Sequence, residues 1–299
     1  EISACLVGSE MCIRDSDVVD CDGVVLKNSF IDAADDALCF KSHDANSMCQ
    51  NVVVENCVGR SSASGLKFGT VSRGGFRNFK VKNIKIYDTY RSAITFAAVD
   101  GALIENIEVD GVRSIHTGNV IYLRIGDRWS AGKKPVMKNI TIKNVYAEIP
   151  MDKPDAGYNY EGPIEDLPRN ISPASIVGLP EYKIQNVTLR NIEIVSPGGG
   201  NPYYAYRGLT PAELDSIPEM ATSYPEFSQF KELPAWGFYI RHAEGITFDN
   251  VTFKALKKDY RPAIVMDDAG EVTFKDVRFI EPEGEGKKQI FPYKSKVIK

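Results

Sequence analysis

The sequence predicts an all-β fold, a right-handed parallel β-helix (solenoid) of about eight coils with long loop insertions. A phrase of the form apolar-x-Asn-apolar-x-apolar recurs along most of the chain, and each copy alternates apolar and polar residues, as a strand does. Helical periodicity is almost absent. One such strand cannot bury its apolar face, whereas strands stacked at about 4.8 Å per coil share a continuous core.

The phrases are anchored by a residue of one type, with a single Asp at the end. The anchors are Asn28, Asn56, Asn83, Asn106, Asn144, Asn191, Asn250 and Asp276, at intervals of 28, 27, 23, 38, 47, 59 and 26 residues. We expect them to lie in line at a turn, because Asn tolerates a left-handed backbone and its amide can bond the Asn of the next coil. A β-sandwich, the rival fold, needs closely spaced hairpin signals that this sequence lacks.

The chain divides at its start. We expect residues 1–16 to be a non-native or disordered N-terminal stretch and 17–299 to be a single parallel β-helix domain, truncated at its N-terminus. The segment CLVGSEMCIRDS resembles the translation of a sequencing adapter, and the repeat begins only at Asp17. The alternative is a natural arm that caps the first coil. We expect the protein to be secreted or periplasmic, with its signal upstream of this stretch.

Composition narrows the possible partners. The net charge of -4, the pI near 5.6 and the scattered lysines give no case for nucleic acid or an anionic membrane, and no apolar run reaches the length of a bilayer span. The six cysteines show no metal-type spacing, so we expect no metal and no cofactor. Cys21, Cys39 and Cys57 are predicted to be small core residues. The oligomeric state stays open.

Three insertions interrupt the repeat, at 126–135, 150–180 and 196–234. The first carries Arg128 and Trp129, and the other two are rich in tyrosine. Aromatic side chains in such loops either stack on sugar rings or pack the loop itself, and the sequence leaves both possibilities open.

The segment 30–42, FIDAADDALCFKS, carries the clearest chemical signal. Neighbouring residues of a strand face opposite sides, so Asp35 and Asp36 can share a surface only beside a bend, which small Ala33 and Ala34 allow. Two acids on one surface are what hydrolysis of a glycosidic bond requires. A solvated Asp-Asp turn is the alternative.

Residues 17–42 resemble a segment of the polygalacturonase-like enzymes, glycoside hydrolase family 28, in the pectin-lyase-like β-helix superfamily. That segment reads Asn-x-Asp-Gly-x-Asp, then a strand, then Gly-Asp-Asp-apolar-x-x-Lys. The resemblance implies that Asp35 is the general acid and that Asp36 positions or activates water. It also implies that Asp17 is a support residue and that Lys41 matches the family lysine.

The chain departs from the family pattern in three places. Arg14 stands where the family has a further catalytic Asp. In SASGLKFGT, Ser64 replaces the family histidine and Lys67 its serine. Ile94 and Phe96 replace an Arg and a Lys that grip the substrate carboxylate. We therefore expect the chain as it stands to be catalytically impaired toward polygalacturonate.

Other basic residues follow the double Asp within a few coils and form a possible replacement flank, although each is also an ordinary surface charge. The candidate substrate-binding residues are Asp17, Lys41, His43, Lys67, Arg73, Arg91, Arg124, Arg128 and Trp129. A second pair, Asp267 and Asp268, is predicted to have a turn role.

The leading hypothesis is an inverting, exo-acting hydrolase of O-glycosidic bonds in acidic plant or algal polysaccharides or oligosaccharides, without a cofactor. A second hypothesis is a lyase on the same scaffold, with Lys67 or Arg73 as base and calcium on Asp35 and Asp36. A third is a glycan-binding β-helix without chemistry.

Overall fold

The computed structural model describes residues 16–158, 172–200, 208–284 and 286–298. It is nearly all β, as predicted, with one short helix, α1 (Pro211–Asp215), and one 3-10 turn, η2 (Phe227–Phe230). The strands are β1 (Ser16–Val19), β2 (Val25–Lys27), β3 (Phe30–Ala33), β4 (Leu38–Ser42), β5 (Cys49–Ser61), β6 (Leu66–Ser72), β7 (Gly75–Ala98), β8 (Leu103–Ile125), β9 (Val136–Glu148), β10 (Ala174–Val177), β11 (Ile184–Gly198), β12 (Phe238–Lys257), β13 (Ile264–Gly270), β14 (Val272–Lys275), β15 (Arg278–Ile280), β16 (Ile290–Tyr293) and β17 (Val297–Ile298).

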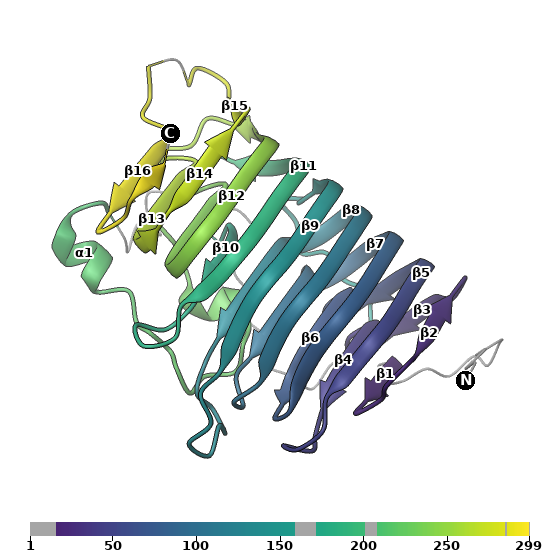
Figure 1. Cartoon of the computed structure of the whole chain (residues 1–299). Coiled ribbons are helices and arrows are strands. Elements are labelled where there is room, and N and C mark those ends of the chain that lie inside the picture. The colour runs from purple at the N-terminus through teal and green to yellow at the C-terminus, as the bar shows by residue number, and fades with distance from the viewer. Residues whose placement is uncertain (1–15, 159–171, 201–207, 285, 299) are drawn as a thin grey trace.

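The named strands pair in parallel, each with a strand one repeat further along the chain. Figure 1 shows β5, β7, β8, β9, β11 and β12 side by side in that order. The segments around Asn83 and Asn106, on β7 and β8, are adjacent and parallel, as predicted.

The long strands bend at left-handed residues, and two columns of these residues across the stack are rich in Asn. Asn83 and Asn106 have φ of 52° and 57°. Asn83 donates from Nδ2 to Oδ1 of Asn56 at 2.7 Å, so the predicted left-handed backbone and amide ladder are both confirmed. The expectation that all anchors lie in one line is wrong, because Asn106 belongs to the second column, where it accepts from Asn139 at 3.2 Å. Gly111, with φ of 81°, takes the first-column position on β8.

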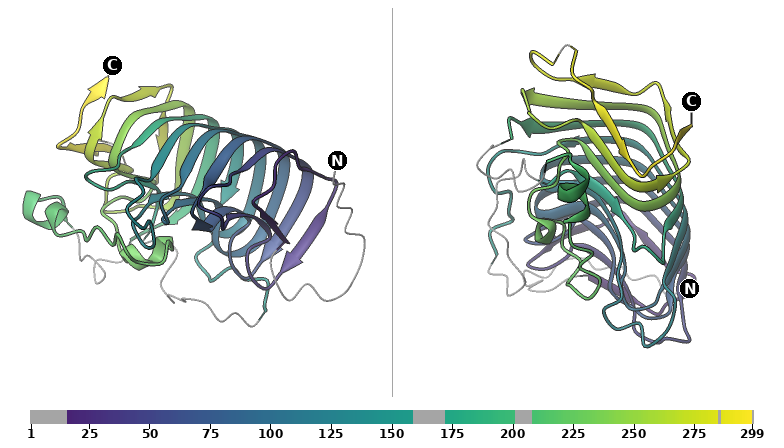
Figure 2. Two further views of the ribbon diagram at one scale, coloured as in Figure 1. Left: turned by 60° about the horizontal axis from the view of Figure 1, so that its bottom comes forward. Right: turned by 90° about the vertical axis from the view of Figure 1, so that its left-hand side faces the viewer.

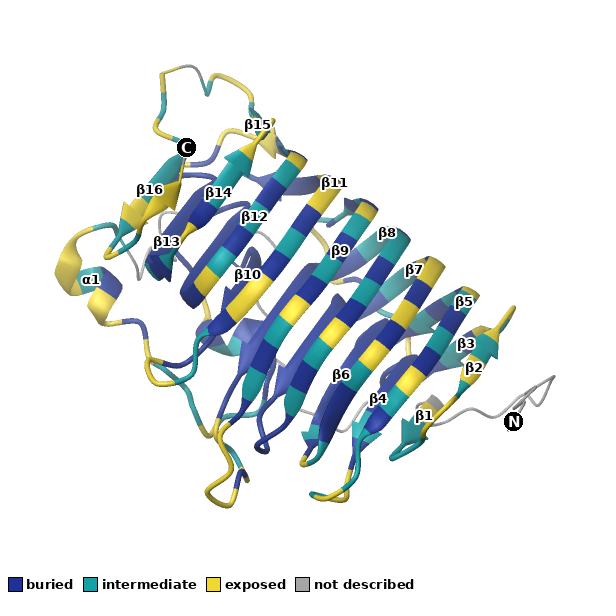
Figure 3. Cartoon of the chain, viewed as in Figure 1, coloured by how far each residue is buried: buried dark blue, intermediate teal, exposed yellow. Residues whose placement is uncertain are grey.

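The inward-facing residues form the core. Every second or third position is buried along β9 and along the first part of β8, and the exposed positions between them form rows across the stack (Figure 3). Phe68 and Phe96, on successive strands, stack with ring centroids 4.5 Å apart. Each such side chain contributes roughly 1.5–3 kcal/mol by burial, so the stack is held mainly by these rows.

Side chains pointing away from this core form a row across the short strand segments. We call it the outer row: Cys39, Lys67, Thr95, Tyr122, Ser175 and Tyr239, each paired in register with the next. The third insertion covers its C-terminal part, with Leu214, Ile217 and Phe230 packed against Tyr122 and Tyr239. Figure 2 shows α1 and η2 at the side of the stacked strands.

Several predictions fall in or beside undescribed segments. Residues 1–15, and with them Cys5 and Cys12, lie outside the described residues.

Cys57 is in the core as predicted, whereas Cys39 is buried on the outer row and Cys21 is half-buried. In the described part of the chain, no helix has the length and apolar character needed to cross a bilayer.

Candidate functional site

The predicted bend at the double Asp is present. Residues 34–37 connect β3 to β4, and the Ala37 amide donates to the Ser64 carbonyl at 2.9 Å. Asp35 is half-buried, and its carbonyl accepts from the Ser61 hydroxyl. Asp36 is only 2% exposed, so the expectation that both carboxylates lie at the surface is wrong for Asp36. Its burial has a cause, because a cation reaches it from the next strand.

Lys67 pairs with Asp36 inside the protein. Its Nζ lies 2.6 Å from Asp36 Oδ2, and the Ser64 amide donates to Asp36 Oδ1 at 2.9 Å. Burial alone would lower the pKa of Lys67, but the charges of Asp36 and Tyr224 outweigh it and hold that pKa well above its ordinary value. Because Lys67 stays protonated, it is unsuited to act as the base of a lyase.

A tyrosine of the third insertion completes this cluster. Tyr224 Oη accepts from Lys67 Nζ at 3.2 Å and from Arg91 Nη1 at 3.3 Å. Both cations also lie over its ring, 5.5 and 5.1 Å from the centroid. Arg91 Nε is 2.6 Å from Glu226 Oε2, in a pair that is almost fully buried. We call Asp36, Lys67, Arg91, Tyr224 and Glu226 the tyrosine cluster.

The second insertion contacts the chain on the other side of the bend at Asp35. The Ser62 hydroxyl, next to the serine that binds Asp35, donates to Asp155 and accepts from the Tyr158 amide at 3.0 Å. Arg60 Nη2 donates to the Ala156 carbonyl at 2.7 Å. Asp35 therefore lies beside two insertions that come from distant parts of the chain.

Two of the predicted binding residues form a separate pair on the first strands. Lys41 Nζ lies 2.5 Å from Asp17 Oδ2, and Asp17 pairs in register with Cys39 of the outer row. The predicted support residue thus lies on the same face as Lys67.

His43 and Arg73 do not join the site. Both are exposed. His43 follows the end of β4 and Arg73 follows the end of β6, whereas Asp36 lies just before the beginning of β4. The His43 amide donates to Asp20 at 3.0 Å, and the Arg73 amide donates to the Ser42 carbonyl at 2.8 Å. A five-residue strand such as β4 spans about 17 Å, so the structure places His43 and Arg73 away from the bend at Asp35, and their role in binding stays a prediction.

Arg124 and Arg128 fasten loops instead of forming a basic flank. Arg124 is buried and donates to the carbonyls of Glu219 and Met220 in the third insertion, at 2.5 and 3.0 Å. Arg128 forms two hydrogen bonds with Asp100, at 3.1 and 3.0 Å. Trp129, on the loop after β8, is exposed, and Arg128 Cζ lies over its ring, 3.8 Å from the ring centroid.

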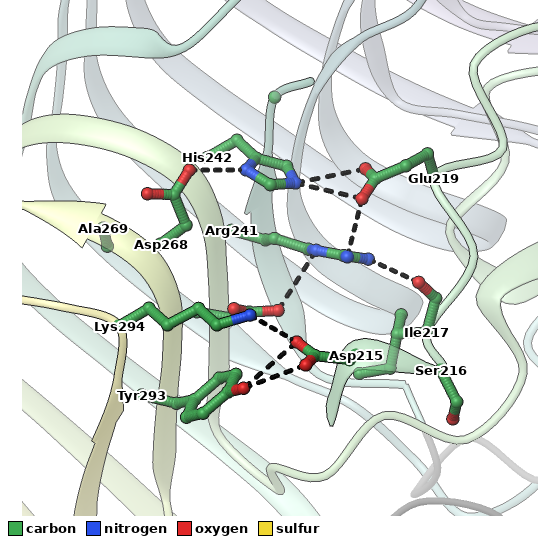
Figure 4. Close-up of polar contacts among 12 residues, drawn as sticks. Asp215, Ser216, Ile217, Glu219, Arg241, His242, Asp268, Ala269, Tyr293 and Lys294 are labelled. Atoms are coloured by element: carbon green, nitrogen blue, oxygen red, sulfur yellow. Dashed lines mark hydrogen bonds and ion pairs between the residues drawn. The ribbon is translucent and has the colours of Figure 1, made fainter. Parts of the chain in front are cut away.

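The second acidic pair belongs to a polar cluster between β12, β13 and the third insertion (Figure 4). Asp268 has φ of 50°, which agrees with the predicted turn role. Arg241 lies 2.6 Å from Glu219 and 3.1 Å from Asp267, and burial raises the pKa of Asp267. His242 joins Asp268, at 2.8 Å from Nδ1, to Glu219, at 3.1 Å from Nε2.

A second histidine makes the same kind of bridge to the second insertion. His116 Nδ1 is 2.7 Å from Asp88, and its Nε2 is 3.2 Å from Asp152. Burial alone would lower the pKa of His116, but the hydrogen bonds and charges of these two carboxylates outweigh it and raise that pKa.

Sequence reasoning missed Glu226 and Asp155 and gave Tyr224 only as a loop aromatic. Their spacing from the double Asp carries no periodic signal. Within the described ranges, no group of three or more His, Cys, Asp or Glu side chains is placed to hold a metal ion. The chain matches no protein-family model, no curated protein and no solved structure.

Proposed function

We propose that this chain is a right-handed parallel β-helix that hydrolyses O-glycosidic bonds in acidic plant or algal polysaccharides or their oligosaccharides, with inversion. It uses no cofactor and works outside the cytoplasm. The parallel stack with its Asn columns supports the scaffold. The observation that carries the reaction is the half-buried Asp35, at a bend beside the ion-paired Asp36 and two insertions.

The two acids have different tasks in this proposal. Asp36 is buried against Lys67, so it holds that cation and cannot reach a substrate. Asp35 is the carboxyl group that meets the sugar, and Asp17 with Lys41 lies on the face of the strands that carries Lys67. The second and third insertions reach the Asp35 bend and the neighbouring tyrosine cluster, which favours attack at chain ends.

The test is an assay of oligogalacturonides, rhamnogalacturonan and algal glycans, read by reducing-end release and by NMR of the first anomer formed. A variant with Asn, Thr, Asp, Gly and Ile at positions 12–16, as in the family motif, is assayed beside the original chain. We expect inverted products, abolished by Asp35→Asn and kept by the control Asp44→Asn, which alters an exposed loop.

Three outcomes would contradict the proposal. Products with an unsaturated, ultraviolet-absorbing end would indicate a lyase. Saturable glycan binding without any product at high protein concentration would indicate a binding module. Hydrolysis that survives Asp35→Asn would remove Asp35 from the reaction.

A further inference from the structure

The phenolic oxygen of Tyr224 is held by two cations at once. Lys67 Nζ and Arg91 Nη1 both donate to it, at 3.2 and 3.3 Å. These two bonds approach from the protein side, because both donors are almost fully buried, whereas the tyrosine itself is half-buried. With donors on its lone pairs, the phenol must direct its own proton away from Lys67 and Arg91.

The surrounding charges favour loss of that proton. Burial raises the pKa of Tyr224, but the positive charges of Lys67 and Arg91 outweigh it, and the pKa is lowered below its ordinary value. The charge of Asp36 opposes this shift without reversing it. The remaining charged neighbour, Glu226, is engaged by Arg91 at 2.6 Å.

We propose that Tyr224 is the general acid of the hydrolysis and that the Asp35 carboxylate is its general base, an assignment that rests on the proposed function. A single ammonium group, that of Lys67, links Tyr224 to Asp36, the neighbour of Asp35. The buried Asp36 cannot act on the substrate, so Tyr224 supplies the second group that an inverting reaction needs.

The order of ionisation decides which group is the acid. A carboxyl group ordinarily ionises roughly six pH units below a phenol. Near neutral pH the prevailing form therefore pairs an Asp35 carboxylate with a Tyr224 phenol.

Overall, the reaction adds one water molecule across the glycosidic bond. The glycosidic C–O bond breaks, its electron pair goes to the leaving oxygen, and that oxygen takes the Tyr224 proton. Water attacks the anomeric carbon from the opposite face and gives a proton to the Asp35 carboxylate. Lys67 and Arg91 stabilise the phenolate that remains until solvent returns its proton.

The first test needs no substrate. Ultraviolet difference titration follows the ionisation of the 14 tyrosines. We expect one phenol to ionise before the others, to be absent in Tyr224→Phe, and to ionise later in Lys67→Met. The control Tyr146→Phe removes a phenol whose pKa is raised by its hydrogen bond to Glu148, so it should leave the early phenol unchanged. A wild type without an early phenol, or an early phenol that persists in Tyr224→Phe, overturns the proposal.

The second test uses any substrate that the wild type cleaves. Tyr224→Phe should lower kcat by about 10²–10⁴-fold and remove the alkaline limb of the pH profile. Aryl glycosides with good leaving groups should lose far less, because they need little protonation. Equal losses on both kinds of substrate, or a preserved alkaline limb, overturn the acid role alone. A chain that is inactive on every substrate, also with the family motif restored at positions 12–16, overturns the proposed function instead.

Discussion

Replacing Lys67 with Met removes one partner of a buried ion pair and leaves the other inside the protein. The two side chains are 2% and 3% exposed, and the Lys67 ammonium also donates to Tyr224 at 3.2 Å. Methionine has nearly the same length and no charge. The variant therefore keeps the packing and leaves the Asp36 carboxylate buried without its cation.

The expected cost is large because an unpaired charge stays in a region of low dielectric. Breaking a buried pair from one side typically costs about 3–5 kcal/mol. For a chain of this size, 1 kcal/mol shifts Tm by about 2 °C, so Lys67→Met should lower Tm by about 6–10 °C. The double variant Asp36→Asn with Lys67→Met should melt higher than Lys67→Met alone, because it removes the stranded charge.

The matched control is Lys27→Met. Lys27 lies 2.9 Å from Glu55, a geometry close to that of the buried pair, but the two side chains are 46% and 34% exposed. Exposed pairs contribute about 0–1 kcal/mol, so its Tm should fall by at most about 2 °C. Circular dichroism melts at neutral pH give both values. If Lys67→Met melts like Lys27→Met, or if the double variant is no better than the single one, the buried-charge argument is wrong.

Three further predictions follow from the bends and bridges. Asn83→Ala should cost about 1–2 kcal/mol, because alanine is strained at φ of 52°, and Asn83→Gly, which loses only the amide bond, should cost less in urea unfolding. The raised pKa of His116 implies stability that is fully present below the unfolded pKa of about 6.5 and is lost as pH rises through the higher folded pKa. The Tm advantage of wild type over His116→Asn should therefore shrink as pH rises above about 6.5. Arg124→Met should expose residues 208–236 to limited proteolysis, and an unchanged digest would contradict its role as the anchor of the third insertion.

The strands could be predicted because their signals are local. Period-two alternation marks each strand, and Asn marks a bend wherever the backbone must turn left-handed. The error at Asn106 has the same origin. Besides the left-handed residues Asp88 and His116, β7 and β8 each have two bends that Asn fits. A glycine fills the first-column bend on β8, so the phrase there matches the second column instead.

The site could be predicted only in part because its contacts are not local. The bend at Asp35 depends on its neighbours in the sequence and was found. The partner of Lys67 in the third insertion lies 157 residues away, in a segment without periodicity. Arg124 is a candidate binding residue in the sequence because arginine is usually exposed, but the third insertion covers it and offers carbonyl oxygens to its guanidinium.

The two histidine bridges connect the bends to the insertions. His116 and His242 both sit at left-handed positions, with φ of 58° and 49°, and each contacts an Asp of a neighbouring strand through Nδ1. A left-handed residue turns its side chain outward at the corner of the stack, where returning loops pass. Nε2 then meets Asp152 of the second insertion or Glu219 of the third. The residues that bend the strands thus also hold the second and third insertions, which contact the bend at Asp35 and supply Tyr224 to the tyrosine cluster.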